Sequence, residues 1–379
     1  MAMGAANPRV PVVVVSGVPG AGKSSVLERL VVANRPSRVG WVVQHLPADP
    51  EAPRSHVGAW QRLRARLEES DGCLHCALRE DLVAEALATV QDGLDALVVE
   101  QPGVLPTNPA AQTIHEDART STAFDVTARV TVVDAGSLLE DLQDGGEVLA
   151  LDGQLAVPDD ALAELAVHQV EQADALVLAE ADACDGEELA VVSALLRRLN
   201  PSAPLLRDTA PELLRKLLRW RPGLAPDDAQ PSHSSTVAEA SMSSTRVSSV
   251  TFQADRPFHP ERFVDLLREP LEGVLRGRGL VWLASRPEVA LRWDHAGPVL
   301  SIEPDSLWSP TSAGGQQLEL VGLDLDARSI RTALRDALLT DDELAADPER
   351  WRELHQGLPS WQADALSDLP IRHSLQEPT

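Results

Sequence analysis

The feature that most constrains the fold is a glycine-rich run that follows a short apolar segment. Val12 to Val15 predicts a buried strand, and it leads into Gly17-Val18-Pro19-Gly20-Ala21-Gly22-Lys23-Ser24, which fits the pattern G-x-x-x-x-G-K-[ST] at every fixed position. Val26, Leu27 and Leu30 follow at helical spacing. A strand, a glycine-rich loop and a helix in this order are typical of a phosphate-binding loop, or P-loop, whose backbone N–H groups surround the phosphates of a nucleotide.

The side chains of this run indicate that the nucleotide is a triphosphate. Lys23 is expected to bridge the β and γ oxygens, and the Ser24 hydroxyl to coordinate Mg²⁺. The chain has only two lysines, Lys23 and Lys216, among its 33 lysine and arginine residues, so a lysine at this position is improbable by chance. The alternative is a strand-to-helix turn that binds no ligand. Nucleotide contacts are expected from Gly17, Pro19, Gly20, Ala21, Gly22, Lys23, Ser24 and Ser25.

Composition limits the partners that the chain can have. A net charge of -25 and a pI near 4.7 argue against a broad basic surface, so we expect no membrane partner and no direct nucleic-acid binding. No apolar run approaches the roughly 20 residues of a membrane span. The 3 cysteines are too few for a disulfide scaffold and suit a reducing compartment. We therefore expect a cytoplasmic protein.

Two kinds of pattern divide the chain. From residue 11 to about 220, short apolar runs alternate with helical patterns, which predicts parallel strands joined by crossover helices. Residues 221–247 are poor in large apolar side chains and predict a flexible linker. The expected fold is α/β, with a P-loop domain at 1–220 built on a parallel sheet with flanking helices. A smaller α+β C-terminal domain is expected at 248–345, and an irregular tail that partly docks at 346–379.

Several later segments occur in an informative order. They are Gly72-Cys73-Leu74-His75-Cys76, Glu100-Gln101-Pro102-Gly103, Val132-Val133-Asp134-Ala135, Leu199-Asn200-Pro201-Ser202-Ala203 and Arg256-Pro257-Phe258-His259-Pro260. Together with the P-loop, they resemble the CobW-type family of P-loop GTPases, which includes metal-insertion and zinc-homeostasis proteins and is related to hydrogenase and urease maturation GTPases. The resemblance spans nearly the whole chain, and it implies a GTPase that uses GTP and Mg²⁺.

The resemblance also assigns roles near the γ-phosphate. Glu100 ends a predicted buried strand, where a P-loop protein places a carboxylate for Mg²⁺, so Glu100 joins Lys23 and Ser24 as a candidate catalytic group. The alternative for Glu100 is a strand-end acid that faces solvent. The resemblance implies that the backbone N–H of Gly103 contacts the γ-phosphate.

The family's base-recognition motif, Asn-Lys-x-Asp, is degenerate in this chain. It aligns with Ala179-Glu180-Ala181-Asp182, in which only the aspartate is kept. Losing one neutral hydrogen bond costs about 0.5 to 1.5 kcal/mol, so guanine preference can persist on Asp182 alone. We expect GTP over ATP; the alternative is that Asp182 is a solvated loop acid and base specificity is lost.

The cysteine motif predicts a zinc site. The central cysteine of the family motif is His75 here, which leaves Cys73 and Cys76 on either side, and thiolate and imidazole are both good zinc ligands. The family's glutamate after the second strand is replaced by His45. We expect His45 to join Cys73 and Cys76 in a tetrahedral zinc site, with His75 as the further candidate ligand. The alternatives are a redox-active cysteine pair and structural thiols that bind nothing.

Three functions are compatible with these features. The first is a slow Mg²⁺-dependent GTPase that couples nucleotide state to zinc binding and transfers the metal to a client metalloprotein. The second, implied by the resemblance to some actinobacterial members, is an interaction protein that recruits a ribosome hibernation factor under zinc limitation. The third is a pseudo-GTPase that binds nucleotide without turnover.

Overall fold

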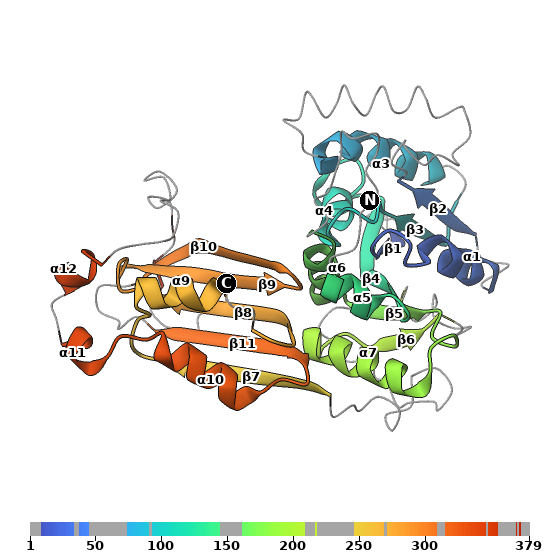
Figure 1. Cartoon of the computed structure of the whole chain (residues 1–379). Coiled ribbons are helices and arrows are strands. Elements are labelled where there is room, and N and C mark those ends of the chain that lie inside the picture. Colours follow the sequence, from blue (N-terminus) through green and yellow to red (C-terminus); the bar gives the residue numbers. More distant parts are fainter. Residues whose placement is uncertain are drawn as a thin grey trace, which may run out of the picture. The chain divides into compact units, whose positions relative to one another are not determined.

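The apolar runs of the first part of the chain form parallel strands in a computed structural model (Figure 1). The structure describes residues 9–33, 38–44, 74–90, 93–144, 161–208, 217, 246–268, 271–308, 315–345, 348–354, 369 and 371–372. The chain divides into two units: Met1–Asp141 with Gly145–Ser243, and Leu142–Asp144 with Ser244–Thr379.

The first unit is a six-stranded sheet with the order β2-β3-β1-β4-β5-β6, in which every pairing is parallel. Because the strands are parallel, their carboxyl ends meet at one edge, where ligands of such folds bind. The strands are β1 (Val10–Ser16), β2 (Val39–Val43), β3 (Ala96–Glu100), β4 (Phe124–Asp134), β5 (Ala175–Ala179) and β6 (Leu205–Arg207). The helices are α1 (Lys23–Ala33), α3 (Leu74–Val90), α4 (Asn108–Glu116), α5 (Leu138–Asp144), α6 (Ala161–Gln172) and α7 (Gly186–Leu199).

Helices cover both faces of this sheet, which explains why its strands are continuously apolar rather than alternating. Successive β1 side chains point to opposite faces. Val13 packs in one core cluster with Leu27 of α1, and Val12 packs in another with Leu82 of α3. β3 and β5 are buried along their whole length.

The second unit is a six-stranded sheet with the order β12-β10-β9-β8-β11-β7, antiparallel except where β12 pairs with β10. This confirms a smaller α+β domain after the P-loop domain. The strands are β7 (Val247–Ala254), β8 (Val274–Trp282), β9 (Val289–Ala296), β10 (Val299–Trp308), β11 (Gln316–Leu323) and β12 (Ile371–Arg372). The helices are α9 (Pro260–Arg268), α10 (Ala327–Asp336), α11 (Asp341–Leu344) and α12 (Pro348–Trp351).

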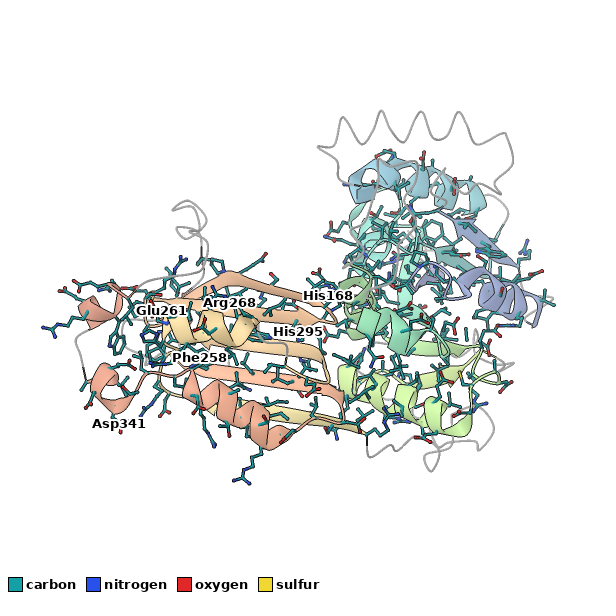
Figure 2. The ribbon with its side chains drawn as sticks, in the orientation of Figure 1. His168, Phe258, Glu261, Arg268, His295 and Asp341 are labelled. Atoms are coloured by element: carbon teal, nitrogen blue, oxygen red, sulfur yellow. The ribbon has the colours of Figure 1, made fainter. Side chains whose placement is uncertain are left out.

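Aromatic side chains form the core of the second unit. Phe258 (Figure 2) is fully buried, and its ring centroid lies 4.9 Å from that of Phe263 in α9. In a separate cluster, Trp282 meets Trp351 edge to face, with ring centroids 6.2 Å apart. Trp351 thus anchors a described part of the segment predicted to be a docking tail. The expected linker at 221–247 lies outside the described residues up to 245, so it stays a prediction.

Candidate functional site

The glycine-rich run forms the turn between β1 and α1. Three glycines of this turn have positive φ values, which residues with a Cβ rarely adopt: 148° at Gly17, 84° at Gly20 and 80° at Gly22. At Gly17 a Cβ would also lie 2.5 Å from the carbonyl oxygen of Val132 in β4. Since α1 begins at Lys23, the run ends at a helix N-terminus, where unpaired N–H groups favour an anion.

Lys23 lies over this turn. Its ammonium group donates to the carbonyl oxygens of Gly17 at 2.8 Å and Val18 at 3.1 Å. Burial lowers the pKa of Lys23 to about 8, and the nearby charge of Glu100 partly opposes this shift. The two hydrogen bonds hold the Lys23 side chain within the P-loop. Phosphate oxygens of a bound nucleotide can replace the carbonyl oxygens of Gly17 and Val18 as acceptors.

The next residue of α1 meets the end of β3. The Ser24 hydroxyl donates to Oε1 of Glu100 at 2.7 Å, and the Glu100 side chain is buried. Its second oxygen, Oε2, has no hydrogen-bond partner among the described residues. A buried carboxylate oxygen without a partner is costly, and a hard cation prefers a hydroxyl and a carboxylate as ligands. These two residues therefore fit the Mg²⁺ that the P-loop implies. Because Glu100 is buried, it is not a solvated strand-end acid.

The loop after β3 lies directly against the glycine-rich turn. A Cβ on Gly103 would lie 2.6 Å from the backbone nitrogen of Pro19 and 2.9 Å from the carbonyl oxygen of Gly17. Real Cβ atoms do not approach backbone atoms so closely, so only glycine fits here without displacing the loop. The structure thus brings Gly103 to the P-loop, as the sequence predicts.

The degenerate base motif lies at the end of β5. Ala179 is buried beside the turn, 3.5 Å from where a Cβ on Gly22 would be, and Glu180 has a φ of 53°. Asp182 is 76% exposed and accepts a hydrogen bond from Arg207 at 2.8 Å. The sequence analysis missed Arg207, which ends β6. The pairing of Leu178 with Arg207 across β5 and β6 brings the arginine near the base motif.

Gln44 connects this site to the helix that carries the cysteine motif. The Gln44 backbone N–H donates to the carbonyl oxygen of Glu100 at 2.9 Å, and its side-chain amide donates to the carbonyl oxygen of Leu78 in α3 at 3.4 Å. Only Glu100 and Gln44 therefore separate Ser24 from the first turns of α3.

The predicted zinc ligands fall largely outside the described residues. His45 and Cys73 lie outside them, and for His75 and Cys76 the structure describes the backbone at the start of α3 but not the side chains. In the described part of the chain, three or more histidine, cysteine, aspartate or glutamate side chains nowhere gather as a metal site would require. The zinc ligand set stays a prediction. Of the helices that the structure describes, none is long and apolar enough to cross a membrane.

Comparison with known proteins identifies both units. Residues 11–207 match the nucleotide-binding domain of the CobW/HypB/UreG family, and residues 247–338 match the cobalamin synthesis protein CobW C-terminal domain. A zinc-regulated GTPase metalloprotein activator of Dictyostelium discoideum is 27% identical over 91% of this chain and 83% of its own length. A zinc chaperone of Mycobacterium tuberculosis is 28% identical over 80% of this chain and 82% of its own. A zinc chaperone CobW of Pseudomonas aeruginosa is 26% identical over 87% and 92%, respectively. From the P-loop to the C-terminal sheet, the chain belongs to the CobW/HypB/UreG family of P-loop GTPases.

Proposed function

We propose that the chain is a Mg²⁺-dependent GTPase whose nucleotide state controls the binding of zinc and its transfer to a client protein. The observation that carries this proposal is the short connection from Ser24 through Glu100 and Gln44 to Leu78 of α3. The family membership and the names of the zinc-regulated relatives support GTP and zinc as the ligands.

The described residues have distinct tasks in this proposal. Lys23 moves from the carbonyls of Gly17 and Val18 to the β and γ oxygens, and its charge opposes theirs. Ser24 and Glu100 hold Mg²⁺, which when bound neutralises charge on the transferred phosphoryl group. Gly103 offers its backbone N–H to the γ-phosphate, so the loop after β3 differs between the triphosphate and diphosphate states.

The link to zinc follows from the position of α3. A displacement of Glu100 displaces Gln44 as well, because the Gln44 backbone N–H donates to the Glu100 carbonyl oxygen. The Gln44 side chain donates to Leu78 of α3, which is close in sequence to Cys76. His45 follows Gln44 directly in the chain. A shift in this strand end therefore moves the predicted ligands from both segments together. Thermodynamic linkage requires zinc and GTP to change each other's affinity by the same factor, commonly about 5- to 150-fold in coupled sites.

A competitive zinc titration tests the proposal. Zinc affinity is measured against a chelator, with GDP and with a non-hydrolysable GTP analogue, in wild type and in Cys73→Ala/Cys76→Ala. Cys184→Ala is the matched control, because Cys184 lies in the P-loop domain after the base motif and outside the predicted ligand set. We expect tight zinc binding that shifts with nucleotide, is lost in the double variant and persists in the control. Zinc binding that ignores Cys73 and Cys76 would remove the basis of the proposal.

A second variant tests the route. Gln44→Ala removes the side-chain contact with Leu78 but keeps the backbone bond to Glu100. We expect it to bind GTP as wild type does, while the effect of nucleotide on zinc affinity falls by about two- to tenfold, the equivalent of one hydrogen bond. Unchanged coupling in Gln44→Ala would show that the signal takes another route.

A further inference from the structure

The loop that carries Gly103 is also held by one residue of α6. The Gln169 side-chain amide donates to the carbonyl oxygens of Gly103 at 3.0 Å and of Leu105 at 2.6 Å. Gln169 is fully buried. Because both contacts are to carbonyl oxygens, only the nitrogen of the amide can make them.

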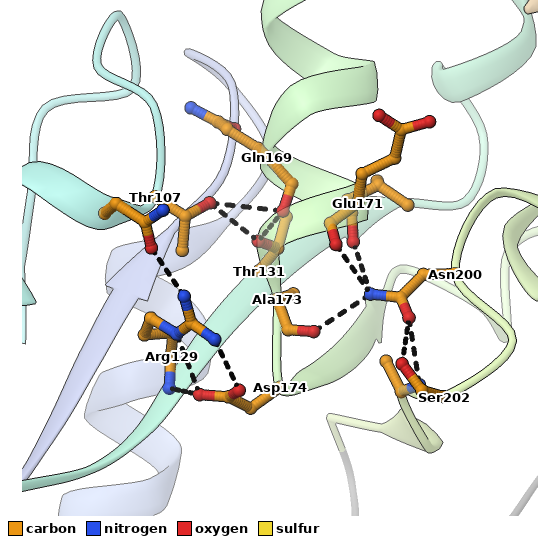
Figure 3. Close-up of polar contacts among 12 residues, drawn as sticks. Thr107, Arg129, Thr131, Gln169, Glu171, Ala173, Asp174, Asn200 and Ser202 are labelled. Carbon is orange, nitrogen blue, oxygen red and sulfur yellow. Dashed lines mark hydrogen bonds and ion pairs between the residues drawn. The ribbon is translucent and has the colours of Figure 1, made fainter. Parts of the chain in front are cut away.

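Gln169 is itself fixed by its backbone (Figure 3). Its carbonyl oxygen accepts from the hydroxyls of Thr131 at 2.7 Å and Thr107 at 3.1 Å. The Ser16 hydroxyl, at the end of β1, lies within hydrogen-bond distance of both threonine hydroxyls. These hydrogen bonds fix the backbone of Gln169, and so the root of its side chain, relative to β1, β4 and the start of α4.

The C-terminal end of α6, where Gln169 lies, is anchored as well. The side-chain amide of Asn200 donates to the carbonyl oxygens of Val170 at 2.8 Å and Ala173 at 2.9 Å, as Figure 3 shows for Ala173. Asn200 is buried, and its own oxygen accepts from Ser202 at 2.8 Å. With α6 fixed at this end, displacement of the whole helix cannot easily relieve the contacts between Gln169 and the loop.

These contacts decide how far the loop can move from the P-loop. Gly103 packs against the backbone of residues 17–19, and its carbonyl oxygen accepts from the amide of Gln169. If Gln169 lost its donor, the carbonyl of Gly103 would lack this bond in a partly buried place, and that of Leu105 would keep only the 3.4 Å contact from the side-chain amide of Gln101. The loop would then gain by turning the Gly103 carbonyl toward water, which carries the Gly103 N–H away from the γ-phosphate position.

We infer that Gln169 is a positioning residue for the γ-phosphate contact: it presets Gly103 against the P-loop and so creates the preference for triphosphate over diphosphate. This inference rests on the proposed nucleotide function but not on zinc. The diphosphate does not reach Gly103, so its affinity should not depend on Gln169.

The test compares the affinities of GDP and a non-hydrolysable GTP analogue, both with Mg²⁺, in the full-length chain. Gln169→Met keeps the length of the side chain and removes the donor, and Gln169→Glu replaces the donor with an acceptor. We expect both variants to weaken the GTP analogue about tenfold, as for the loss of one or two buried hydrogen bonds, with GDP affinity within about twofold of wild type.

Gln316→Glu is the matched control, because it makes the same amide-to-carboxylate change at a fully buried position in β11 of the second unit, where the Gln316 side-chain amide donates to the carbonyl oxygen of Arg256 at 2.7 Å. It should lower the unfolding temperature as Gln169→Glu does, yet leave the ratio of the two affinities unchanged. Equal loss of GDP and GTP analogue in Gln169→Met, or an unchanged ratio, would overturn the inference. Wild type that prefers the GTP analogue but shows no coupling to zinc would contradict the proposed function and leave the role of Gln169 standing.

Discussion

Replacing Glu100 with glutamine tests the magnesium site with almost no change in shape. Glu100 is 5% exposed in the wild type, its Oε1 accepts from Ser24 at 2.7 Å, and its Oε2 has no partner among the described residues. Glu100→Gln keeps an oxygen for Ser24 and removes the charge. A bond to a charged group is worth about 1.5 to 3 kcal/mol, so we expect the apparent Mg²⁺ affinity of the nucleotide complex to fall about 10- to 150-fold.

The stability of the free protein should respond differently. Removing a buried charge relieves desolvation, while Lys23 loses the charge that raises its pKa. These effects oppose each other, so the free energy of unfolding should change by less than the free energy of Mg²⁺ binding does. Titrating Mg²⁺ against a fluorescent GTP analogue gives the first quantity, and denaturant unfolding gives the second. Glu180→Gln, at an exposed position after β5, is the control. A Mg²⁺ affinity in Glu100→Gln within twofold of wild type would refute the assignment.

Three further predictions concern the same site. The pKa of Lys23 is about 8 in the folded chain and 10.5 when unfolded. Burial of Lys23 therefore destabilises the folded state fully below pH 8, and this destabilisation decreases as the pH rises from 8 to 10.5. Triphosphate binding at about pH 8.5 should therefore take up most of one proton, measured by calorimetry in buffers of different ionisation enthalpy, and Lys23→Arg should take up none. Gly103→Ala should weaken the GTP analogue about tenfold or more because its Cβ meets Pro19, whereas Gly186→Ala, whose Cβ meets nothing within 4 Å, should be neutral. Asp182→Ala should reduce the preference for GTP over ATP about tenfold in competition binding, and Arg207→Ala should raise it by at most about fivefold, the value of an exposed ion pair. An unchanged preference in Asp182→Ala would mean that this residue does not read the base.

The sequence predicts the P-loop domain well because its signals are local. The apolar runs of β1, β3 and β5 are buried on both faces, so each reads as a strand without knowledge of its neighbours. The C-terminal sheet is harder to predict. Strand β8, Val274–Trp282, contains Gly277 and Gly279, which in a local pattern indicate a break and not a strand. Gly279 allows β11 to approach so closely that a Cβ would lie 1.9 Å from the carbonyl oxygen of Gln317.

The candidate site divides in the same way. Lys23, Ser24, Glu100 and Gly103 belong to motifs whose spacing places them, and the structure brings them together. Gln169 could not be found in this way, because its contacts with the Gly103 loop join residues 64 and 66 positions apart. Arg207 depends on the register of a three-residue strand. Such contacts follow from tertiary packing, which no local pattern encodes.

Reciprocity between the two ligands tests the central claim most directly. The affinity for a non-hydrolysable GTP analogue is measured with and without saturating zinc, and the affinity for zinc with and without the analogue. The account predicts that zinc changes the affinity for the analogue by the same factor by which the analogue changes the affinity for zinc. In Cys73→Ala/Cys76→Ala zinc should no longer change the affinity for the analogue, and in Gln44→Ala the factor should be closer to one than in wild type. Tight binding of both ligands with both affinity ratios equal to one would contradict the account, since nucleotide state would then not change the affinity for zinc.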